Sequence, residues 1–272
     1  MAIETILATA ALAYAGIVGL VYAKQESLLF SPDRLRRHPH DVGLSNVEVI
    51  SLATPDKERL VAWYTPATAG KPTILFLHGK GGSIADRPER YEFYVSRGYG
   101  VLFLSYRGYG GSTGRPSEQG LMTDARAAYD WLVAAAVPPA LIGVVGESLG
   151  TGIAAGLAAR VPIGALALEA PYVSMTAVAK TRYWWLPVDM LIRNPIHAGA
   201  AIRNYRGPVL MFHGDRDTII PLPIGRRLYE MANEPKEFVL VPGGDHFIFT
   251  EDTFAHELVF FDRHLGHLPA DQ

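Results

Sequence analysis

Short apolar runs recur along the chain from residue 47 onward, and each is bounded by Gly, Pro or Asn. Such runs, rich in Val, Ile and Leu, are typical of buried strands. We expect strands at residues 47–52, 60–64, 73–78, 100–106, 141–146, 164–169, 209–213 and 238–241. The first two alternate apolar and polar positions, which predicts an antiparallel pair. The later ones are almost continuously apolar, as in parallel strands that are covered on both faces.

Helical patterns lie between and after the later strands. Their apolar residues recur at helical spacing, at residues 87–97, 117–136, 148–160, 222–232 and 250–265. Alternation of strand and helix predicts an α/β protein with a mainly parallel, doubly wound sheet of eight strands around one core. Ligands of such sheets bind at the carboxyl ends of the strands, so we expect the chemistry in the loops that follow them.

The N-terminal residues have a different pattern. From Thr5 to Ala23 there are 19 residues without a charge. About 20 apolar residues span a hydrocarbon core as a helix, and Ala and Gly occur on all sides of this one, which leaves no polar face for water. The pattern predicts a transmembrane helix within a membrane anchor at residues 1–26. A signal peptide cleaved after Ala23 and a buried helix of a soluble protein are the alternatives.

Charges around this run predict its orientation. Basic residues follow the run and none precedes it: Lys24, Arg34, Arg36 and Arg37. By the positive-inside rule, the rest of the chain is expected on the cytoplasmic side of the membrane. Cleavage as a signal peptide would instead give a secreted protein.

Composition excludes several classes of protein. Hydrophobic residues make up 49% of the chain and charged residues 19%, which excludes a disordered chain, a collagen and a coiled coil. The 272 residues include no Cys, so there is no disulfide framework, thiolate metal site or Cys nucleophile. A net charge of -2 without a basic block argues against a nucleic-acid partner.

The strongest candidate for chemistry is the segment Gly-Glu-Ser-Leu-Gly at residues 146–150, between an expected strand and an expected helix. This G-x-S-x-G pattern forms a sharp turn in which the Ser takes a strained backbone, and side chains at the two Gly positions would clash. Ser148 then lies exposed at a helix N-terminus as the expected nucleophile. The alternative is that Ser148 only caps the helix.

A Ser nucleophile needs an acid and a His, which follow it in that order along the chain. His246, after the last expected strand, is the expected base, with a purely structural loop histidine as the alternative. Asp217 is the preferred acid, because Asp215 is close to the end of its strand and is placed to serve the turn. Asp215 and Glu169 remain alternatives for the acid, and Asp245 is expected to form a turn.

An acyl-transfer site also needs two backbone donors for a developing oxyanion. We expect them to be the N–H groups of Leu149, after the nucleophile, and of Lys80, in the loop after the strand at residues 73–78. The Lys80 side chain is expected to be solvated. His78 and His213 each precede a Gly at a strand end, where structural hydrogen bonding beneath the site is the expected role.

The sequence implies no cofactor and no metal. Residues 150–155 match the G-x-G-x-x-A pattern of dinucleotide-binding proteins, but the first Gly does not directly follow the strand. We expect these glycines to let a helix pack closely on the sheet. His38 and His40, and likewise His264 and His267, do not make a closed set of metal ligands.

These residues together resemble a known family. The matching stretches run in family order from residue 28 to about 265: Leu28-Leu29-Phe30, residues 75–79 (LFLHG), residues 106–110 (YRGYG) with Ser112, Gly114 and residues 116–118 (PSE), residues 146–150, His213-Gly214, Asp217, Pro221 and Asp245-His246. The chain resembles the serine hydrolases of the α/β-hydrolase superfamily. It is most similar to the membrane-anchored branch typified by fungal bud-emergence-type proteins and animal α/β-hydrolase-domain proteins, including protein depalmitoylases. The resemblance implies an α/β-hydrolase fold and matches the acid to Asp217 and the base to His246. Many relatives have Asn-Ala-Gly where this chain has Lys80-Gly81-Gly82.

The resemblance also implies a small helical cap at about residues 171–207. Within it, Tyr183, Trp184 and Trp185 are contiguous and cannot all be buried on one face. With an N-terminal anchor, an apolar cap near the bilayer predicts that these aromatics bind an acyl chain. Packing of the same aromatics on the sheet is the alternative.

The sequence therefore predicts a membrane-tethered serine hydrolase whose hydrolase domain occupies residues 27–272. It is expected to cleave carboxylic ester or thioester bonds of apolar, lipid-like acyl substrates through an acyl-enzyme. An acyltransferase with the same triad, or a non-catalytic scaffold of the same fold, is the alternative.

Overall fold

A sheet of eight strands, in the order β10-β9-β8-β7-β4-β6-β3-β2, forms the centre of the computed structural model, which describes residues 1–248 and 250–265. The strands are β2 (Glu48–Ala53), β3 (Arg59–Thr65), β4 (Thr73–Leu77), β6 (Gly100–Ser105), β7 (Ile142–Glu147), β8 (Ala165–Glu169), β9 (Val209–Gly214) and β10 (Lys236–Val241). Neighbours are parallel except that β3 runs antiparallel to both β2 and β6. Each expected strand is present, and the expected antiparallel pair is β2 with β3. Two very short strands that the pattern did not predict, β1 (Ser31–Pro32) and β5 (Gly81–Gly82), pair in parallel beside this sheet.

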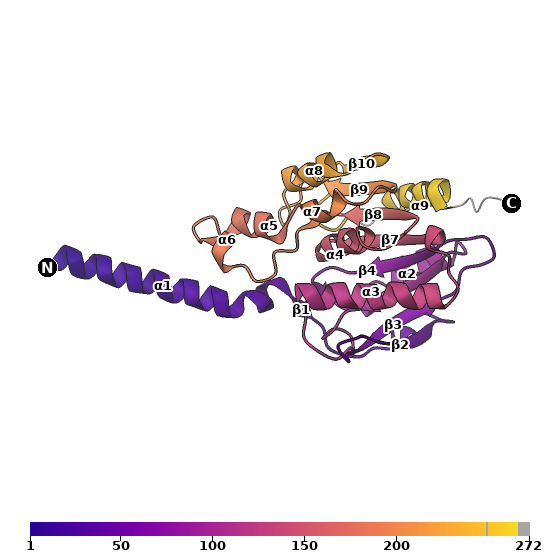
Figure 1. Cartoon of the computed structure of the whole chain (residues 1–272), viewed down its shortest axis with the longest axis horizontal. Helices are drawn as coiled ribbons and strands as arrows, with labels where there is room; N and C mark the ends of the chain where they lie inside the picture. Colours follow the sequence, from indigo (N-terminus) through magenta and orange to yellow (C-terminus); the bar gives the residue numbers. More distant parts are fainter. Residues whose placement is uncertain (249, 266–272) are drawn as a thin grey trace.

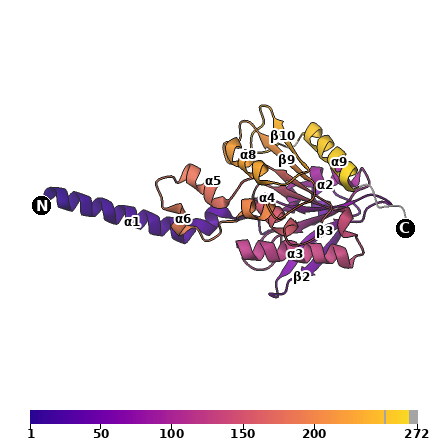
Figure 2. The same ribbon diagram turned by 45° about the horizontal axis from the view of Figure 1, so that its top comes forward.

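Helices cover both faces of the sheet (Figures 1 and 2). They are α1 (Ala2–Leu29), α2 (Pro88–Val95), α3 (Glu118–Ala134), α4 (Leu149–Ala158), α5 (Met175–Arg182), α6 (Val188–Leu191), α7 (Ala198–Ile202), α8 (Leu222–Met231) and α9 (Glu251–Leu265). Alternate residues of β4 explain the two layers: Leu75 and Leu77 join a core with α3, α4, α7 and α8, whereas Ile74 and Phe76 join a core with α2 and α9. Both faces of the strand are apolar because both are covered. The expected doubly wound fold is confirmed.

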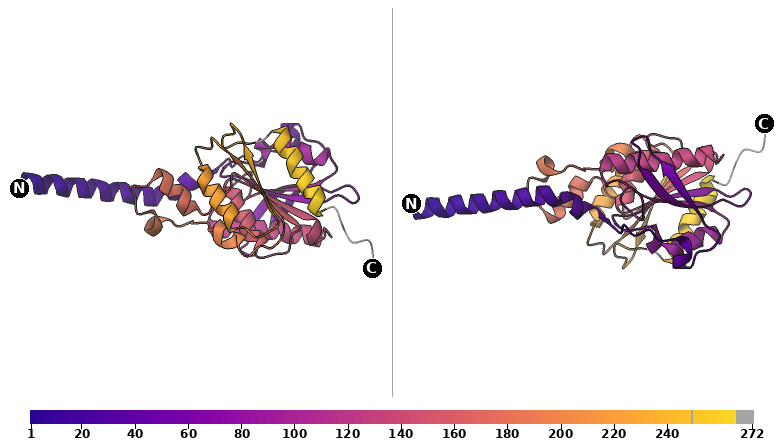
Figure 3. Two further views of the ribbon diagram at one scale, coloured as in Figure 1. Left: turned by 90° about the horizontal axis from the view of Figure 1, so that it is seen from above. Right: turned by 90° about the horizontal axis from the view of Figure 1, so that it is seen from below.

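Helix α1 extends away from this body in every view (Figure 3). None of its residues is buried, and an 18-residue window within it has a mean hydropathy of 2.0. The alternative of a helix buried in a soluble core is therefore wrong, because no residue of α1 is buried by the rest of the fold. By length and composition α1 is a candidate transmembrane span. The helix continues past the expected run to Leu29, so that its last turns lie against the body.

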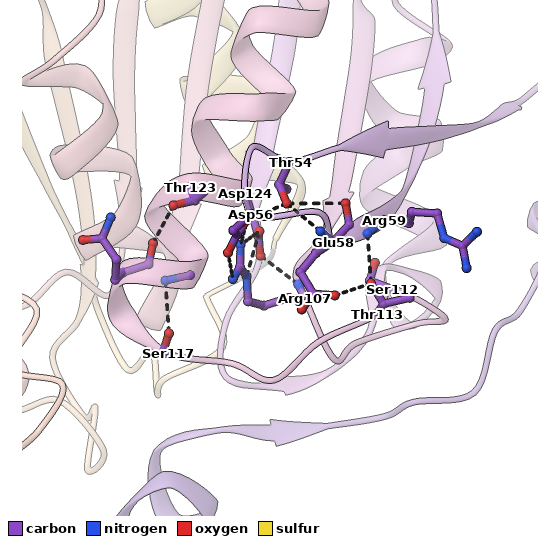
Figure 4. A network of polar contacts seen from close by, with 12 residues as sticks. Thr54, Asp56, Glu58, Arg59, Arg107, Ser112, Thr113, Ser117, Thr123 and Asp124 are labelled. Carbon is purple, nitrogen blue, oxygen red and sulfur yellow. Dashed lines mark hydrogen bonds and ion pairs between the residues drawn. The ribbon is translucent and has the colours of Figure 1, made fainter.

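Arg107, shortly after the end of β6, contacts both α3 and the turn between β2 and β3 (Figure 4). Its guanidinium donates to Asp124 of α3 at 2.8 and 2.9 Å and to Asp56 of the β2–β3 turn at 2.6 and 3.2 Å. The Arg107 amide also donates to Asp124 at 2.8 Å. Burial raises the pKa of Asp124 despite the opposing effect of Arg107. Since Asp124 has no exposed surface, its charge depends on this one arginine.

Two further arginines, both from the start of α2, reach the carboxyl ends of the strands. Arg87 donates to both oxygens of Glu147 at 2.9 and 2.5 Å, and Arg90 donates to both oxygens of Glu169 at 2.7 and 2.6 Å. Burial favours a higher pKa for Glu147, but the charge and hydrogen bonds of Arg87 outweigh it and hold the pKa at about 2. The two strand ends beside residue 148 are thus fixed by charge-assisted, bidentate contacts.

Removing Arg107 tests the first of these contacts. Arg107→Ala leaves Asp124 as an uncompensated buried charge, which typically costs about 3–5 kcal/mol. Arg126→Ala is the matched control. Arg126 pairs with Asp130 on the exposed face of α3, the helix that also carries Asp124, and such an exposed pair contributes roughly 0.3–0.5 kcal/mol. The free energy of unfolding of the detergent-solubilised chain distinguishes them. Equal losses in the two variants would contradict the structural role of Arg107.

The Glu147–Arg87 pair predicts a pH dependence of stability. The folded pKa of about 2 lies below the value of 4.5 for an ordinary glutamate, so the stabilisation is complete above pH 5 and is lost as the pH falls through 4.5 toward 2. Wild type should exceed Glu147→Gln in unfolding free energy at pH 7, and this difference should shrink by roughly 2 kcal/mol at pH 3. Denaturant titrations at the two pH values measure it, and a difference independent of pH would refute the assignment.

Candidate active site

Ser148 lies in a strained turn between β7 and α4. Its φ of 50° and ψ of −115° place a non-glycine residue in a region that L side chains rarely adopt. A Cβ at Gly150 would lie 2.0 Å from the Leu77 carbonyl oxygen, and one at Gly146 would lie 2.7 Å from the Gly150 carbonyl oxygen. Both positions of the motif therefore require glycine, as the sequence predicts, and the turn presents Ser148 at the N-terminus of α4.

His246 and Asp217 complete a hydrogen-bonded series with this serine. His246 Nε2 is 2.9 Å from Ser148 Oγ, and His246 Nδ1 is 2.7 Å from Asp217 Oδ2. The three side chains come from loops after β7, β9 and β10, at the carboxyl edge of the sheet. The structure thus brings together the three residues that the sequence pattern selected.

Asp217 is held as an anion. Its second oxygen accepts the backbone N–H groups of Ile219 and Ile220, each at 2.8 Å. Burial opposes the charge of Asp217, but the hydrogen bond with His246 and these amides lower its pKa below the usual range. His213 Nε2 lies 2.8 Å from the Ile220 carbonyl oxygen and so fixes the same loop. An ionised carboxylate on Nδ1 leaves Nε2 of His246 free to accept a proton from Ser148.

The other carboxylates considered from the sequence have different partners. Asp215 accepts the Gly243 amide at 2.7 Å and joins the loops after β9 and β10. Asp245 accepts the Phe247 amide at 2.8 Å, as a turn former does. Glu169 is bound by Arg90. The hydrogen bond to His246 Nδ1 comes from Asp217.

The backbone of the loop that carries Lys80 is oriented by hydrogen bonds from neighbouring side chains to its amide and carbonyl groups. His78 Nδ1 lies 2.7 Å from the Gly79 carbonyl oxygen, and burial lowers the pKa of His78 to about 3, so its imidazole is neutral and Nδ1 donates. The Gly79 amide donates to Glu147 at 3.3 Å, and the Tyr109 hydroxyl donates to the Lys80 carbonyl at 2.8 Å. His78 therefore holds the carbonyl of the Gly79–Lys80 peptide, whose N–H group is the expected donor to an oxyanion.

An apolar cavity of about 670 Å³ lies over Ser148. Ser148, Leu149, His246 and the Lys80 loop form its base, and Tyr183 and Leu186 of the cap form part of its wall. Another part of the wall belongs to α1, whose Val21, Tyr22, Gln25, Leu28 and Leu29 also line the cavity. The volume is that of a small-molecule site.

The cap aromatics do not share one role. Tyr183 lines the cavity, as expected, whereas Trp184 and Trp185 lie outside it and are 80% and 40% exposed. The sequence predicts that both tryptophans contact substrate, but neither of them lines the cavity in the structure. The reason is that consecutive side chains on an irregular loop point in different directions. Sequence reasoning also missed the α1 wall and the Arg87–Glu147 pair, for which no motif or spacing gave a signal.

The features that suggested cofactors have structural explanations. Of the two glycines in the G-x-G-x-x-A match, Gly150 packs against the Leu77 carbonyl at the end of β4, as expected for close packing on the sheet. Gly152 packs against Tyr172 and Ile196, where a Cβ would come within 3 Å. Among the described residues, no group of three His, Asp or Glu side chains has the spacing of a metal site. His267 lies outside the described residues.

This arrangement has the parts that acyl transfer requires. The Ser148 hydroxyl is hydrogen-bonded to the His246 imidazole, which the ionised Asp217 carboxylate orients. Helix α4 begins at Leu149, directly after Ser148, so that the site lies at a helix N-terminus, where the helix dipole favours negative charge. The surrounding cavity is largely apolar.

Comparison with known proteins identifies the fold and its relatives. A family model described as alpha/beta hydrolase fold matches residues 72–195. An uncharacterized protein of Mycobacterium tuberculosis is 37% identical over 244 residues, which are 89% of this chain and 87% of that protein. The lysophosphatidylserine lipase ABHD12 of Danio rerio is 33% identical over 195 residues, which are 64% of this chain and 51% of the lipase. The match to this lipase thus spans about half of its length.

Solved structures agree with the sequence relatives. The esterase Pf2001 of Pyrococcus furiosus superposes with a TM-score of 0.72 over 87% of this chain and 97% of the esterase, at 22% sequence identity. At this identity the likeness concerns the fold alone. Family model, sequence relatives and architecture point the same way, and the chain belongs to the α/β-hydrolase superfamily.

Proposed function

We propose that the protein is a serine hydrolase that cleaves carboxylic ester or thioester bonds of lipid-like acyl substrates at a membrane. The observation that carries this proposal is the series Ser148, His246 and Asp217 beneath an apolar cavity. Two similar proteins, a lysophosphatidylserine lipase and an esterase, support the same class of reaction.

In the proposed reaction Ser148 Oγ attacks the acyl carbonyl while His246 Nε2 takes its proton. Asp217 stabilises the imidazolium that forms, and the N–H groups of Leu149 and Lys80 stabilise the oxyanion. His246 then protonates the leaving alcohol or thiol, which departs and leaves an acyl group on Ser148. Water attacks this ester with His246 as base, and the carboxylic acid is released.

The membrane enters the proposal through α1. We place residues 1–26 as an anchor and residues 27–272, with a cap at about 171–207, as the hydrolase domain. The basic residues that follow the span favour the cytoplasmic side for this domain. A cavity of about 670 Å³ with mostly apolar walls fits an acyl chain better than a polar substrate.

Fluorophosphonate labelling tests the nucleophile. The detergent-solubilised chain should be labelled and should hydrolyse p-nitrophenyl esters, whereas Ser148→Ala should lose the label and lower kcat by roughly 10⁶-fold. Turnover that favours longer acyl chains supports a lipid-like substrate. Folded wild type that takes no label would overturn the proposal in favour of a scaffold, and preferential transfer to added alcohols would favour an acyltransferase.

Two neighbouring aspartates give a matched test of the acid. Asp217→Asn should lower kcat by about 10⁴-fold, because an amide no longer stabilises the imidazolium or selects the correct tautomer of His246. Asp215→Asn, two residues earlier, removes a loop contact with the Gly243 amide and should change kcat far less. Steady-state kinetics with a short-chain ester measure both variants. Comparable losses in the two would show that the acid is wrongly assigned.

A further inference from the structure

Helix α1 is joined to the site without a linker. Directly after α1, the Ser31 amide donates to the Lys80 carbonyl at 3.0 Å, and β1 pairs with β5 in the loop that follows Lys80. The Lys80 ammonium also lies 3.5 Å from the Leu28 carbonyl oxygen. The end of the candidate span is therefore bound to the loop that offers the expected oxyanion donor, and the direction of α1 relative to Ser148 is set by these contacts.

The cavity over Ser148 overlaps the apolar run of α1. Val21 and Tyr22 belong to the 19 uncharged residues and also line the cavity, as Leu29 does near its base. From Leu29 to Val21 the helix rises ~12 Å. The half-buried residues Val18, Val21, Gln25 and Leu29 form one stripe at helical spacing on this side of α1. The cavity thus extends from the nucleophile along the helix toward the membrane.

The cap follows α1 into the same region (Figures 1 and 3). The Tyr14 hydroxyl donates to the Trp185 carbonyl at 3.0 Å, and the two rings meet edge to face with centroids 6.4 Å apart. Nearer the body, Gln25 donates to the Leu191 carbonyl at 3.1 Å and accepts the Arg193 amide at 2.8 Å. The cap is therefore fixed along about half the length of α1.

The length of the apolar run then determines the depth of the cap. Nineteen helical residues rise ~29 Å, which matches a hydrocarbon core of about 30 Å and places its near boundary at Ala23 and Lys24. Tyr14 lies ~14 Å beyond that boundary. Since the Tyr14 hydroxyl is hydrogen-bonded to the Trp185 carbonyl, α1 cannot span the membrane unless the tip of the cap enters one leaflet. Arg193, which donates to the Tyr22 carbonyl and lies 3.3 Å from Glu26, marks the boundary with charge.

The chemistry of the cap tip suits that position. Trp184 and Met190 are 80% and 86% exposed, a large apolar surface for a segment in water. Asp189 is the one charged residue of positions 183–191, and it pairs with Lys180 at 2.6 Å. Irregular backbone at membrane depth needs internal partners, and the amides of residues 186, 188, 190 and 192 all donate to carbonyls within the cap.

We propose that the cap segment at residues 183–191 is immersed in one leaflet beside α1, and that the acyl chain reaches Ser148 directly from that leaflet along the α1 wall of the cavity. The entry route rests on the proposed hydrolase function; the depth of the cap does not. The ligand is a membrane lipid acyl chain, recognised by the apolar residues of α1 and the cap. Helix α1 is then part of the binding site as well as an anchor.

The first experiment measures depth. The chain has no Cys, so Trp184→Cys, Met190→Cys, Leu12→Cys and Glu230→Cys each carry one environment-sensitive fluorophore in phosphatidylcholine vesicles. Probes at 184 and 190 should be quenched by lipids with brominated acyl chains and protected from aqueous iodide. The probe at position 12, on an exposed part of α1, is the control that shows the same response. The probe on exposed Glu230 of α8 should respond in the opposite way. Probes at 184 and 190 that behave like the one at 230 would overturn the immersion of the cap.

The second experiment tests the route with two neighbouring positions on α1. Val21→Trp fills the membrane end of the cavity, whereas Leu20→Trp places the same side chain on the 61% exposed face. One methylene in an apolar pocket changes rates by roughly 10–200-fold. Val21→Trp should therefore lower the ratio of kcat/KM for a long-chain ester in vesicles to kcat/KM for a short-chain soluble ester by at least about tenfold. Leu20→Trp should leave that ratio unchanged.

The outcomes separate the two proposals. Equal chain-length ratios in Val21→Trp and Leu20→Trp, with active wild type, would reject the α1 route while leaving the hydrolase intact. Wild type that hydrolyses neither ester would reject the hydrolase, and the fluorescence data would still report whether the cap lies in the leaflet.

Discussion

The close approach of α4 to the ends of β4 and β7 is the constraint on which the site depends. Gly150 lies so near the Leu77 carbonyl that a single methyl group would not fit, and this contact forces the turn that strains Ser148. The same approach brings the first amides of α4 beside the loop of His78 and Lys80, which begins where β4 ends. The expected nucleophile and the expected oxyanion donors are therefore positioned by one piece of packing rather than by separate loops.

The contact between α4 and the strand ends lies between two different environments. Buried ion pairs lie on its protein side, and the apolar cavity lies on its outer side. On the protein side, Arg87 holds Glu147, and Glu147 in turn accepts the Gly79 amide, so one ion pair supports both the elbow and the oxyanion loop. On the outer side, the cavity presents mostly carbon to a ligand. A low dielectric over preorganised donors strengthens their effect on a developing charge. The strain at Ser148 is tolerated because the surrounding contacts over-determine the turn.

Local patterns were sufficient for the strands and the elbow because each depends on neighbours in sequence. Apolar runs located all eight main strands, and the two glycines around Ser148 follow from the turn itself. The position of Asp217 further along the loop favours it over Asp215 as the acid, and in the structure Asp217 is the residue hydrogen-bonded to His246 Nδ1. The Arg87–Glu147 contact joins residues 60 apart with no repeated spacing. The outward turn of Trp184 likewise depends on how the cap folds, which no periodicity encodes.

The role of α1 illustrates a second limit of sequence reasoning. A uniform apolar run predicts a span whatever it packs against, because hydropathy has no direction around the helix. The structure supplies that direction: Val21, Gln25 and Leu29 lie on one side and face the cap and the cavity, while Leu20 lies on the other. An anchor that only tethered the domain would tolerate a flexible connection between the span and the body. Here the chain passes from α1 into β1 and onto the Lys80 loop within a few residues, so the helix cannot tilt without moving the site. The direction of the candidate span and the geometry over Ser148 are therefore coupled by covalent structure and hydrogen bonds.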